Sequence, residues 1–179
     1  MIRSRLAFSA LLLTVPFALQ TVLASETMPQ AGQEAPVFTL PSQDGTNISL
    51  ADFRGKWVVL YFYPKDGTPG CTIEAHNFQR DLSKYSQENA VIVGVSVDTT
   101  GSHKEFCAQQ GLTFKLLSDT EKKVVSQYGS LRDMGGTQIA SRNTFLINPE
   151  GKIVKVWTGV NPRVHSEEVL AALSGMEKK

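Results

Sequence analysis

The sequence of 179 residues has only two cysteines, Cys71 and Cys107. They lie 107 − 71 = 36 residues apart, so the sequence has no Cys-x-x-Cys pair. This excludes a dithiol enzyme that exchanges disulfides through that motif. Neither cysteine lies near Ala24, where a leader could be cut, so a lipid on a new N-terminal cysteine is excluded as well.

The sequence also lacks an excess of charge of either sign. Its 18 basic and 17 acidic residues leave a formal charge of +1, which gives no support to a nucleic-acid partner or to a polybasic membrane surface. No internal repeat or low-complexity tract interrupts it. A chain of this length, 41% apolar and 20% charged, is suited to one well-packed domain.

The first two dozen residues differ from the rest. Arg3 and Arg5 precede a mostly apolar run from residue 6 to residue 23, and small or apolar side chains precede Ala24. This pattern predicts a secretory signal peptide over residues 1–24 and an exported, periplasmic protein. The alternative is an uncleaved membrane anchor, although Pro16 and Gln20 interrupt the run. Residues 25–33 are polar, which predicts a flexible leader before a domain at 34–179.

One segment delivers a cysteine from a strand to a helix. Residues 57–62 form an apolar and aromatic run typical of a strand covered on both faces, and prolines and glycines then break it. From Thr72 to about Glu88 the apolar spacing is helical, so Cys71 is expected in or just before the first helical turn. Unpaired backbone N–H groups and the helix dipole favour a thiolate there.

The other elements complete an α/β pattern of strands and helices. We expect short hairpins over 37–50 and 144–157, a second buried strand at 91–97 and a helix at 102–110 with a Ser102–Glu105 capping box. Further helices are expected at 119–128 and from Asn161 onward, and the Gly-rich stretch at 131–136 is expected to be a mobile loop. Strand, helix and strand around Cys71 imply a parallel crossover.

Pro64, Thr68 and Cys71 form the motif Pro-x-x-x-Thr-x-x-Cys, and with it the chain resembles the peroxiredoxins, in the bacterioferritin-comigratory-protein or peroxiredoxin Q branch. Four further matches follow in order: Gly-x-x-Ala-Pro-x-Phe-x-Leu at 32–40, Leu-x-x-Phe-x-Gly-Lys at 50–56, the strand at 93–98 and Ser-Arg-Asn-Thr-Phe-Leu-Ile at 141–147. The resemblance implies a thioredoxin-like α/β sandwich, with a mixed central sheet flanked by helices.

The resemblance also implies a thiol peroxidase in which Cys71 attacks the O–O bond and becomes a sulfenic acid. A thiol with a pKa near ~8.5 is about 3% thiolate at pH 7, so complete ionisation raises the rate at most about 30-fold. Larger gains must come from groups that hold the peroxide. By resemblance Thr68 donates to the peroxide, Arg142 serves both sulfur and peroxide, and Pro64 walls the pocket.

Each of these residues also has an ordinary structural interpretation. Thr68 in a turn commonly makes only a local backbone hydrogen bond, and Pro64 commonly just ends a strand. The assignment of Arg142 depends on its position before Asn-Thr-Phe-Leu-Ile, since an arginine beside a strand is commonly solvated. Arg132 is the alternative candidate for the same role. Glu74 can favour the first helical turn or touch the chemistry.

Cys107 is interpreted as the resolving cysteine. Many members of the branch carry that cysteine five residues after the peroxidatic one, where this chain has His76, but some relatives carry it on the next helix, as Cys107 would be. It would attack the sulfenic acid within one chain and form a disulfide that an external dithiol reduces. The alternatives are an inert buried thiol in a one-cysteine enzyme and a permanent bridge to Cys71.

The expected substrates are hydrogen peroxide and small organic hydroperoxides, and the expected reductant is thioredoxin or a similar dithiol. A monomer or weak dimer without cofactor or metal is expected. The rival from another class is a redox-sensing or metal-binding module using the cysteines with His76, His103 and His165. A glutathione-peroxidase-like enzyme is a weaker alternative.

Overall fold

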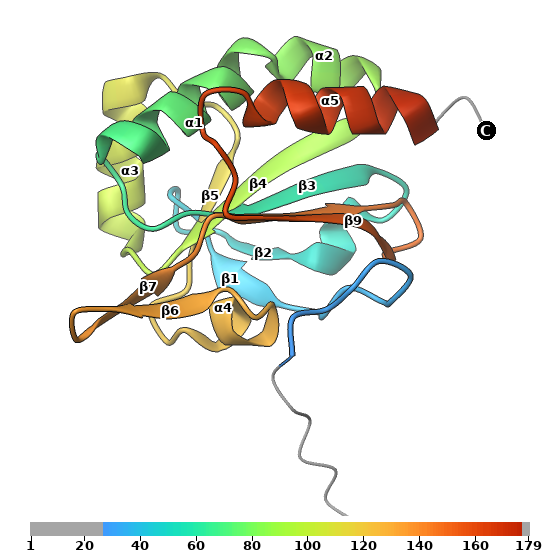
Figure 1. Ribbon diagram of the computed structural model, residues 1–179. Coiled ribbons are helices and arrows are strands. Elements are labelled where there is room, and N and C mark those ends of the chain that lie inside the picture. The colour runs from blue at the N-terminus through green and yellow to red at the C-terminus, as the bar shows by residue number, and fades with distance from the viewer. Residues whose placement is uncertain (1–26, 177–179) are drawn as a thin grey trace, which may run out of the picture.

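The structure, a computed structural model, describes residues 27–176, so the expected signal peptide lies outside the described residues. A five-stranded mixed sheet forms its centre, in the order β5-β4-β3-β8-β9 (Figure 1). The strands are β3 (Trp57–Phe62), β4 (Ala90–Ser96), β5 (Lys115–Ser118), β8 (Asn143–Ile147) and β9 (Ile153–Thr158). β3, β4 and β5 run parallel, whereas β8 is antiparallel to β3 and to β9.

Helices cover one face of this sheet, and a mixed layer covers the other. The helical layer contains α1 (Pro69–Arg80), α2 (Leu82–Gln87), α3 (Thr100–Gln110) and α5 (His165–Met176). The other layer contains the hairpin β1 (Thr39–Pro41) and β2 (Asn47–Ser49), the short helix η1 (Leu50–Phe53) and α4 (Lys123–Gln127). Beside it lies the hairpin of β6 (Leu131–Met134) and β7 (Thr137–Ala140). The predicted thioredoxin-like sandwich is therefore confirmed.

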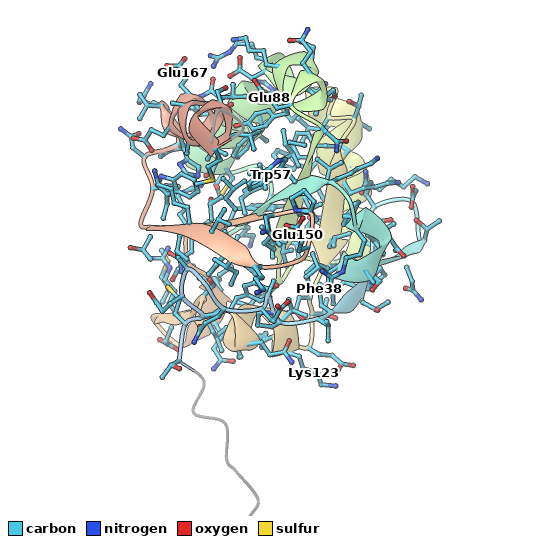
Figure 2. The ribbon with its side chains drawn as sticks, turned by 90° about the vertical axis from the view of Figure 1, so that its right-hand side faces the viewer. Phe38, Trp57, Glu88, Lys123, Glu150 and Glu167 are labelled. Atoms are coloured by element: carbon cyan, nitrogen blue, oxygen red, sulfur yellow. The ribbon has the colours of Figure 1, made fainter. Side chains whose placement is uncertain are left out.

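Alternation along the strands explains the two cores. In β3, Val59 and Tyr61 point into the helical layer, while Val58, Leu60 and Phe62 point into the opposite one. Apolar residues at every position are expected for a strand buried on both faces. Figure 2 shows side chains filling both layers, with Trp57 on the helical side and Phe38 on the other.

Three expected helices have different bounds. The helix expected from Thr72 to Glu88 starts at Pro69 and is divided at Asp81, whose carboxylate bonds Arg80, Lys84 and the Ser166 hydroxyl. The helix expected at 119–128 is shorter, because Lys122 adopts a left-handed φ of 60° just before it. The last helix begins at His165 rather than Asn161.

The predicted Ser102–Glu105 capping box is wrong. The N-cap of α3 is Thr99, whose side chain accepts the N–H of Ser102, while the Ser102 hydroxyl donates to Asp66. Strand β5 carries no strong apolar alternation and was not predicted.

Two segments expected to be mobile are ordered parts of the fold. The stretch at 131–136 is half of the β6–β7 hairpin, since Gly135 and Gly136 both take positive φ, as a two-residue hairpin turn requires. The leader expected at 25–33 is packed where it is described: the Gly32 N–H donates to the Ile153 carbonyl, and the Ile153 N–H donates to the Gln33 carbonyl. Met28 packs on the core beside Gly129.

Candidate active site

Cys71 is the third residue of α1 and lies at its open end. Thr68 is the N-cap, Pro69 fills the first helical position, and the Thr72 N–H donates to the Thr68 carbonyl. Among the described residues, the backbone N–H groups of Gly70 and Cys71 have no acceptor, as is usual for a first helical turn. The expectation that Cys71 begins a helix is met, and these two donors are available to an oxygen bound at the sulfur.

Arg142 reaches the sulfur from the neighbouring strand. It immediately precedes β8, which pairs with β3 so that Asn143 lies opposite Phe62. Phe62 is the last residue of β3, and the turn at 63–68, called the catalytic turn below, leads from it to α1. Its Nη2 atom donates to Cys71 Sγ at 3.2 Å, and its Nη1 atom donates to Glu74 Oε2 at 2.6 Å. One guanidinium therefore links the cysteine to a carboxylate one helical turn further along α1.

Gly70 leaves room for this contact. A Cβ atom at Gly70 would lie 2.7 Å from Arg142 Nη2, the nitrogen that bonds the sulfur. No positive φ requires glycine here, so the reason is the close approach of the guanidinium. The sequence pattern indicated Gly70 only as a residue that interrupts the strand, and its position directly before the cysteine is the signal that was missed.

Glu74 is a buried partner of Arg142. Its side chain is 1% exposed, and Oε1 has no hydrogen-bond partner among the described residues. Burial raises its pKa to about 7, although the Arg142 guanidinium acts in the opposite direction. The pKa of Arg142 is raised: burial alone would lower it, but the charges of Cys71 and Glu74 more than offset that effect.

Thr68 lies at the site, but its hydroxyl is engaged elsewhere. The Thr68 Oγ1 donates to the Lys65 carbonyl at 3.0 Å, which is the local backbone bond weighed above as the ordinary structural interpretation. For Thr68 to donate to a peroxide, as the resemblance implies, this bond has to break. Its catalytic role stays a prediction.

A hollow of about 480 Å³ opens over the cysteine. Pro64, Thr68, Gly70 and Arg142 line one side, and Arg132, Met134, Thr137 and Ile139, from one face of the β6–β7 hairpin, line the other. Pro64 thus stands where a wall was expected. Arg132 shares the hollow, but Arg142 is the arginine that contacts the sulfur. Cys71 itself is 1% exposed below this hollow.

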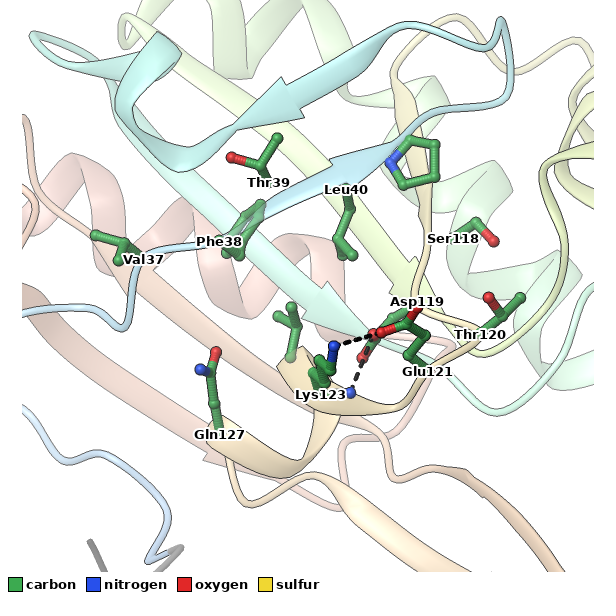
Figure 3. Close-up of a pocket in the computed structure, with 12 residues that line it drawn as sticks. Val37, Phe38, Thr39, Leu40, Ser118, Asp119, Thr120, Glu121, Lys123 and Gln127 are labelled. Carbon is green, nitrogen blue, oxygen red and sulfur yellow. Dashed lines mark hydrogen bonds and ion pairs between the residues drawn. The ribbon is translucent and has the colours of Figure 1, made fainter. Parts of the chain in front are cut away.

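A second hollow of about 410 Å³ lies in the other layer, between β1 and α4 (Figure 3). Phe38 and Leu40 line it together with Asp119, which accepts the backbone N–H groups of Lys123 and Val125. Asp119 is thus occupied in holding the start of α4, and none of Thr68, Gly70 and Arg142, which line the first hollow next to Cys71, lines this one. We therefore place the chemistry at Cys71.

Cys107 lies in the same core as Cys71, and both are free thiols. Burial, and secondly the charge of Asp66, raise the pKa of Cys107 to about 11. The permanent Cys71–Cys107 bridge weighed above is thus not formed in this structure. The histidines considered for a metal are dispersed: His76 is exposed on α1, whereas His103 and His165 are buried in separate hydrogen-bond networks. Within residues 27–176 no cluster of three or more potential metal ligands occurs.

The raised pKa of Glu74 gives a testable pH dependence. Between its ordinary value of 4.5 and about 7, the folded protein binds a proton that the unfolded chain releases, so this group's contribution to stability is lost as pH rises through that range. Relative to Glu74→Gln, the unaltered protein should lose up to about 3 kcal/mol of unfolding free energy over the range. Urea unfolding of the reduced proteins at several pH values measures this. Glu105→Gln, which changes an exposed glutamate on α3 in the same way, is the control. Parallel stability profiles for the unaltered and Glu74→Gln proteins would contradict it.

Comparison with known proteins agrees with this geometry. The family model of the AhpC/TSA family matches residues 31–156. Peroxiredoxin Bcp of Xanthomonas campestris is 40% identical over 151 residues, covering 81% of this chain and 94% of its own, and peroxiredoxin Bcp of Bacillus subtilis is 39% identical over 154 residues, covering 84% and 98%. A solved structure of Xylella fastidiosa PrxQ superposes with a TM-score of 0.80 at 35% identity and covers 84% of this chain and 98% of its own. The chain belongs to the AhpC/TSA family and, within it, to the Bcp or peroxiredoxin Q branch of thiol peroxidases.

Proposed function

We propose that this peroxidase reduces hydrogen peroxide and small organic hydroperoxides in two steps that use both cysteines. Cys71 attacks the peroxide and forms the sulfenic acid, and the departing oxygen leaves as water or an alcohol. Cys107 then attacks that sulfur, water is released, and the resulting disulfide is reduced by thioredoxin or a similar dithiol. The enzyme acts as a monomer or weak dimer.

The observation that carries the proposal is the contact of Arg142 Nη2 with Cys71 Sγ at 3.2 Å at the open end of α1. The guanidinium contacts the sulfur, and the unpaired N–H groups of the first helical turn belong to Cys71 itself and to Gly70 beside it. A peroxide oxygen held there would lie in line with the sulfur, with donors next to the oxygen that gains charge.

The apolar part of the hollow supports organic hydroperoxides as substrates. Met134 is 61% exposed and lies beside Ile139 on the face of the hairpin that lines the hollow. A solved structure of the Xanthomonas campestris bacterioferritin comigratory protein, 38% identical with a TM-score of 0.73 and covering 78% of this chain and 91% of its own, is described in terms of alkyl peroxide reduction. In this chain Met134 and Ile139 offer apolar contacts to an alkyl group.

The position of Cys107 supports its role as the resolving cysteine. Two solved structures are cysteine variants of Xanthomonas campestris peroxiredoxin Q, and the two replaced cysteines lie 84 − 48 = 36 residues apart. Cys71 and Cys107 have the same separation of 107 − 71 = 36 residues, and both side chains face the core between the sheet and the helical layer.

Variants of the two cysteines test this proposal. Peroxide consumption with a thioredoxin-type donor should be abolished in Cys71→Ser, and in Cys107→Ser it should be lost or become dependent on small external thiols. Peptide mapping of the peroxide-treated protein should show one Cys71–Cys107 bond. Full activity of Cys107→Ser with the same donor would establish the one-cysteine alternative, and a single turnover by the unaltered chain despite excess donor would establish the redox-sensing module.

We also propose that the protein is exported after cleavage following Ala24. The arginines and apolar run at 1–24 support this proposal, and no helix among residues 27–176 is long and apolar enough to cross a membrane. Expression of the full chain in a Gram-negative host, followed by fractionation and intact-mass measurement, should find a periplasmic protein that begins at Ser25. A full-length chain retained with the cytoplasmic fraction would contradict export, and a full-length chain in the membrane fraction would establish the anchor.

A further inference from the structure

A buried polar network joins the catalytic turn to the helix that carries Cys107. The Asp66 carboxylate, in the turn between β3 and α1, accepts the Tyr63 hydroxyl at 2.7 Å and the Ser102 hydroxyl at 2.7 Å and lies 2.8 Å from His103 Nδ1. The side chains of Asp66 and His103 are only 7% and 0% exposed. The Asp66 backbone N–H donates to Asp98 just before α3. The turn is therefore hydrogen-bonded both to α3 and to the segment just before α3.

Asp66 and His103 form the centre of this network. The second ring nitrogen of His103 lies 3.2 Å from the Leu117 carbonyl, so each nitrogen faces an oxygen acceptor. The Tyr63 hydroxyl also lies 3.2 Å from His103 Nδ1, so Tyr63 and Asp66 contact the same ring nitrogen. Burial alone would raise the pKa of Asp66, but His103 and the neighbouring hydroxyls hold it below its usual value. Separating the two side chains leaves buried polar groups without partners and is therefore unfavourable.

Both members of the pair lie close to a cysteine in the chain. Asp66 precedes Cys71 by five residues, in the turn that leads into α1. His103 precedes Cys107 by four residues on α3, so the two share one face of the helix. The pair thus joins the segment that delivers one reacting sulfur to the helix that delivers the other.

In this arrangement Cys107 is poorly placed to attack. Its side chain is buried, and its raised pKa, to which the Asp66 charge contributes, keeps it a thiol rather than the nucleophilic thiolate. The two free cysteines belong to different helices, Cys71 to α1 and Cys107 to α3, so we expect disulfide formation to involve local opening of α3 or of the turn between β3 and α1. Where opening precedes the chemical step, the observed rate is proportional to the fraction of molecules that are open.

We propose that the buried Asp66–His103 contact is a latch that limits the rate of Cys71–Cys107 disulfide formation. The inference rests on the proposed function of Cys107 as the resolving cysteine. Asp66 and His103 are positioning residues, and the step they control is the condensation of the Cys107 thiol with the Cys71 sulfenic acid, which forms the S–S bond and releases water. A closed latch prolongs the life of the sulfenic acid, and a second peroxide can then oxidise it to the sulfinic acid.

Single-turnover kinetics of Asp66→Asn and His103→Asn test the latch. Each reduced protein is mixed with one equivalent of hydrogen peroxide and quenched with an alkylating reagent, and sulfenic acid, disulfide and sulfinic acid are counted by intact mass. Disulfide formation should be about tenfold faster in both variants, because loss of a charged buried contact favours the open state. The sulfinic acid formed at millimolar peroxide should fall in parallel.

His165→Asn is the matched control. His165 is also 0% exposed, and its ring nitrogens contact a carboxylate, Glu168, and the Thr144 hydroxyl, but it lies on α5 and joins neither cysteine segment to the other. A merely structural effect of removing a buried histidine would change both proteins alike. The latch predicts a disulfide rate within twofold of the unaltered protein for His165→Asn.

Ser102→Ala is a milder second variant. It removes one donor to Asp66 and keeps the Asp66–His103 contact, and it should accelerate disulfide formation about threefold, whether or not Asp66→Asn and His103→Asn fold. An unchanged disulfide rate in Ser102→Ala and in the folded variants among Asp66→Asn and His103→Asn would overturn the latch, as would equal acceleration in His165→Asn. If the unaltered protein forms no Cys71–Cys107 disulfide, the resolving role fails, and the latch fails with it. A disulfide that forms at a rate indifferent to these variants overturns the latch alone.

Discussion

The contact of the Arg142 guanidinium with the Cys71 sulfur is the interaction on which the arrangement of the site depends. It requires β8 beside β3, because that pairing places Arg142 next to the turn that leaves β3. It requires a residue without a side chain at Gly70, since a Cβ there would meet the guanidinium. It also requires Glu74 one turn further along α1, because Glu74 accepts from Nη1, the second terminal nitrogen of the forked guanidinium. A lysine has no fixed fork with which to hold both partners.

Burying the charged groups of the site lowers the stability of the folded protein, and the Glu74 carboxylate accounts for much of this effect. Glu74 has one oxygen paired with Arg142 and one without a partner among the described residues, and burial raises its pKa to about 7. Nearby, the Tyr61 hydroxyl is also buried and unpartnered within that part of the chain. Such groups reduce stability and persist where they position reacting atoms. Around Cys107, by contrast, burial raises the pKa of the thiol to about 11, so the sulfur is protonated at neutral pH.

Much of the fold was readable from the sequence because its signals are local. The apolar run at β3, the glycine and proline turn after it and the helical spacing after Cys71 depend only on neighbouring residues. Asp66 and His103 were not predicted as partners, because they are 37 residues apart in the sequence and meet only in the folded chain. Strand β5 was missed because its four residues show no strong apolar alternation and pair in parallel with β4 rather than in a hairpin. The left-handed pair at Gly135 and Gly136 was interpreted as flexibility although it makes a hairpin turn.

The reactivity of Arg142→Lys toward two reagents tests the central claim most directly. Alkylation of Cys71 by iodoacetamide requires only the thiolate, whereas hydrogen peroxide must also be held and its departing oxygen stabilised. Lysine keeps the charge but not the fork, so we expect alkylation within about threefold of the unaltered protein and a peroxide rate constant at least about 100-fold lower. A fall of both rate constants in the same proportion would show that Arg142 acts only by ionising the sulfur and would contradict the account.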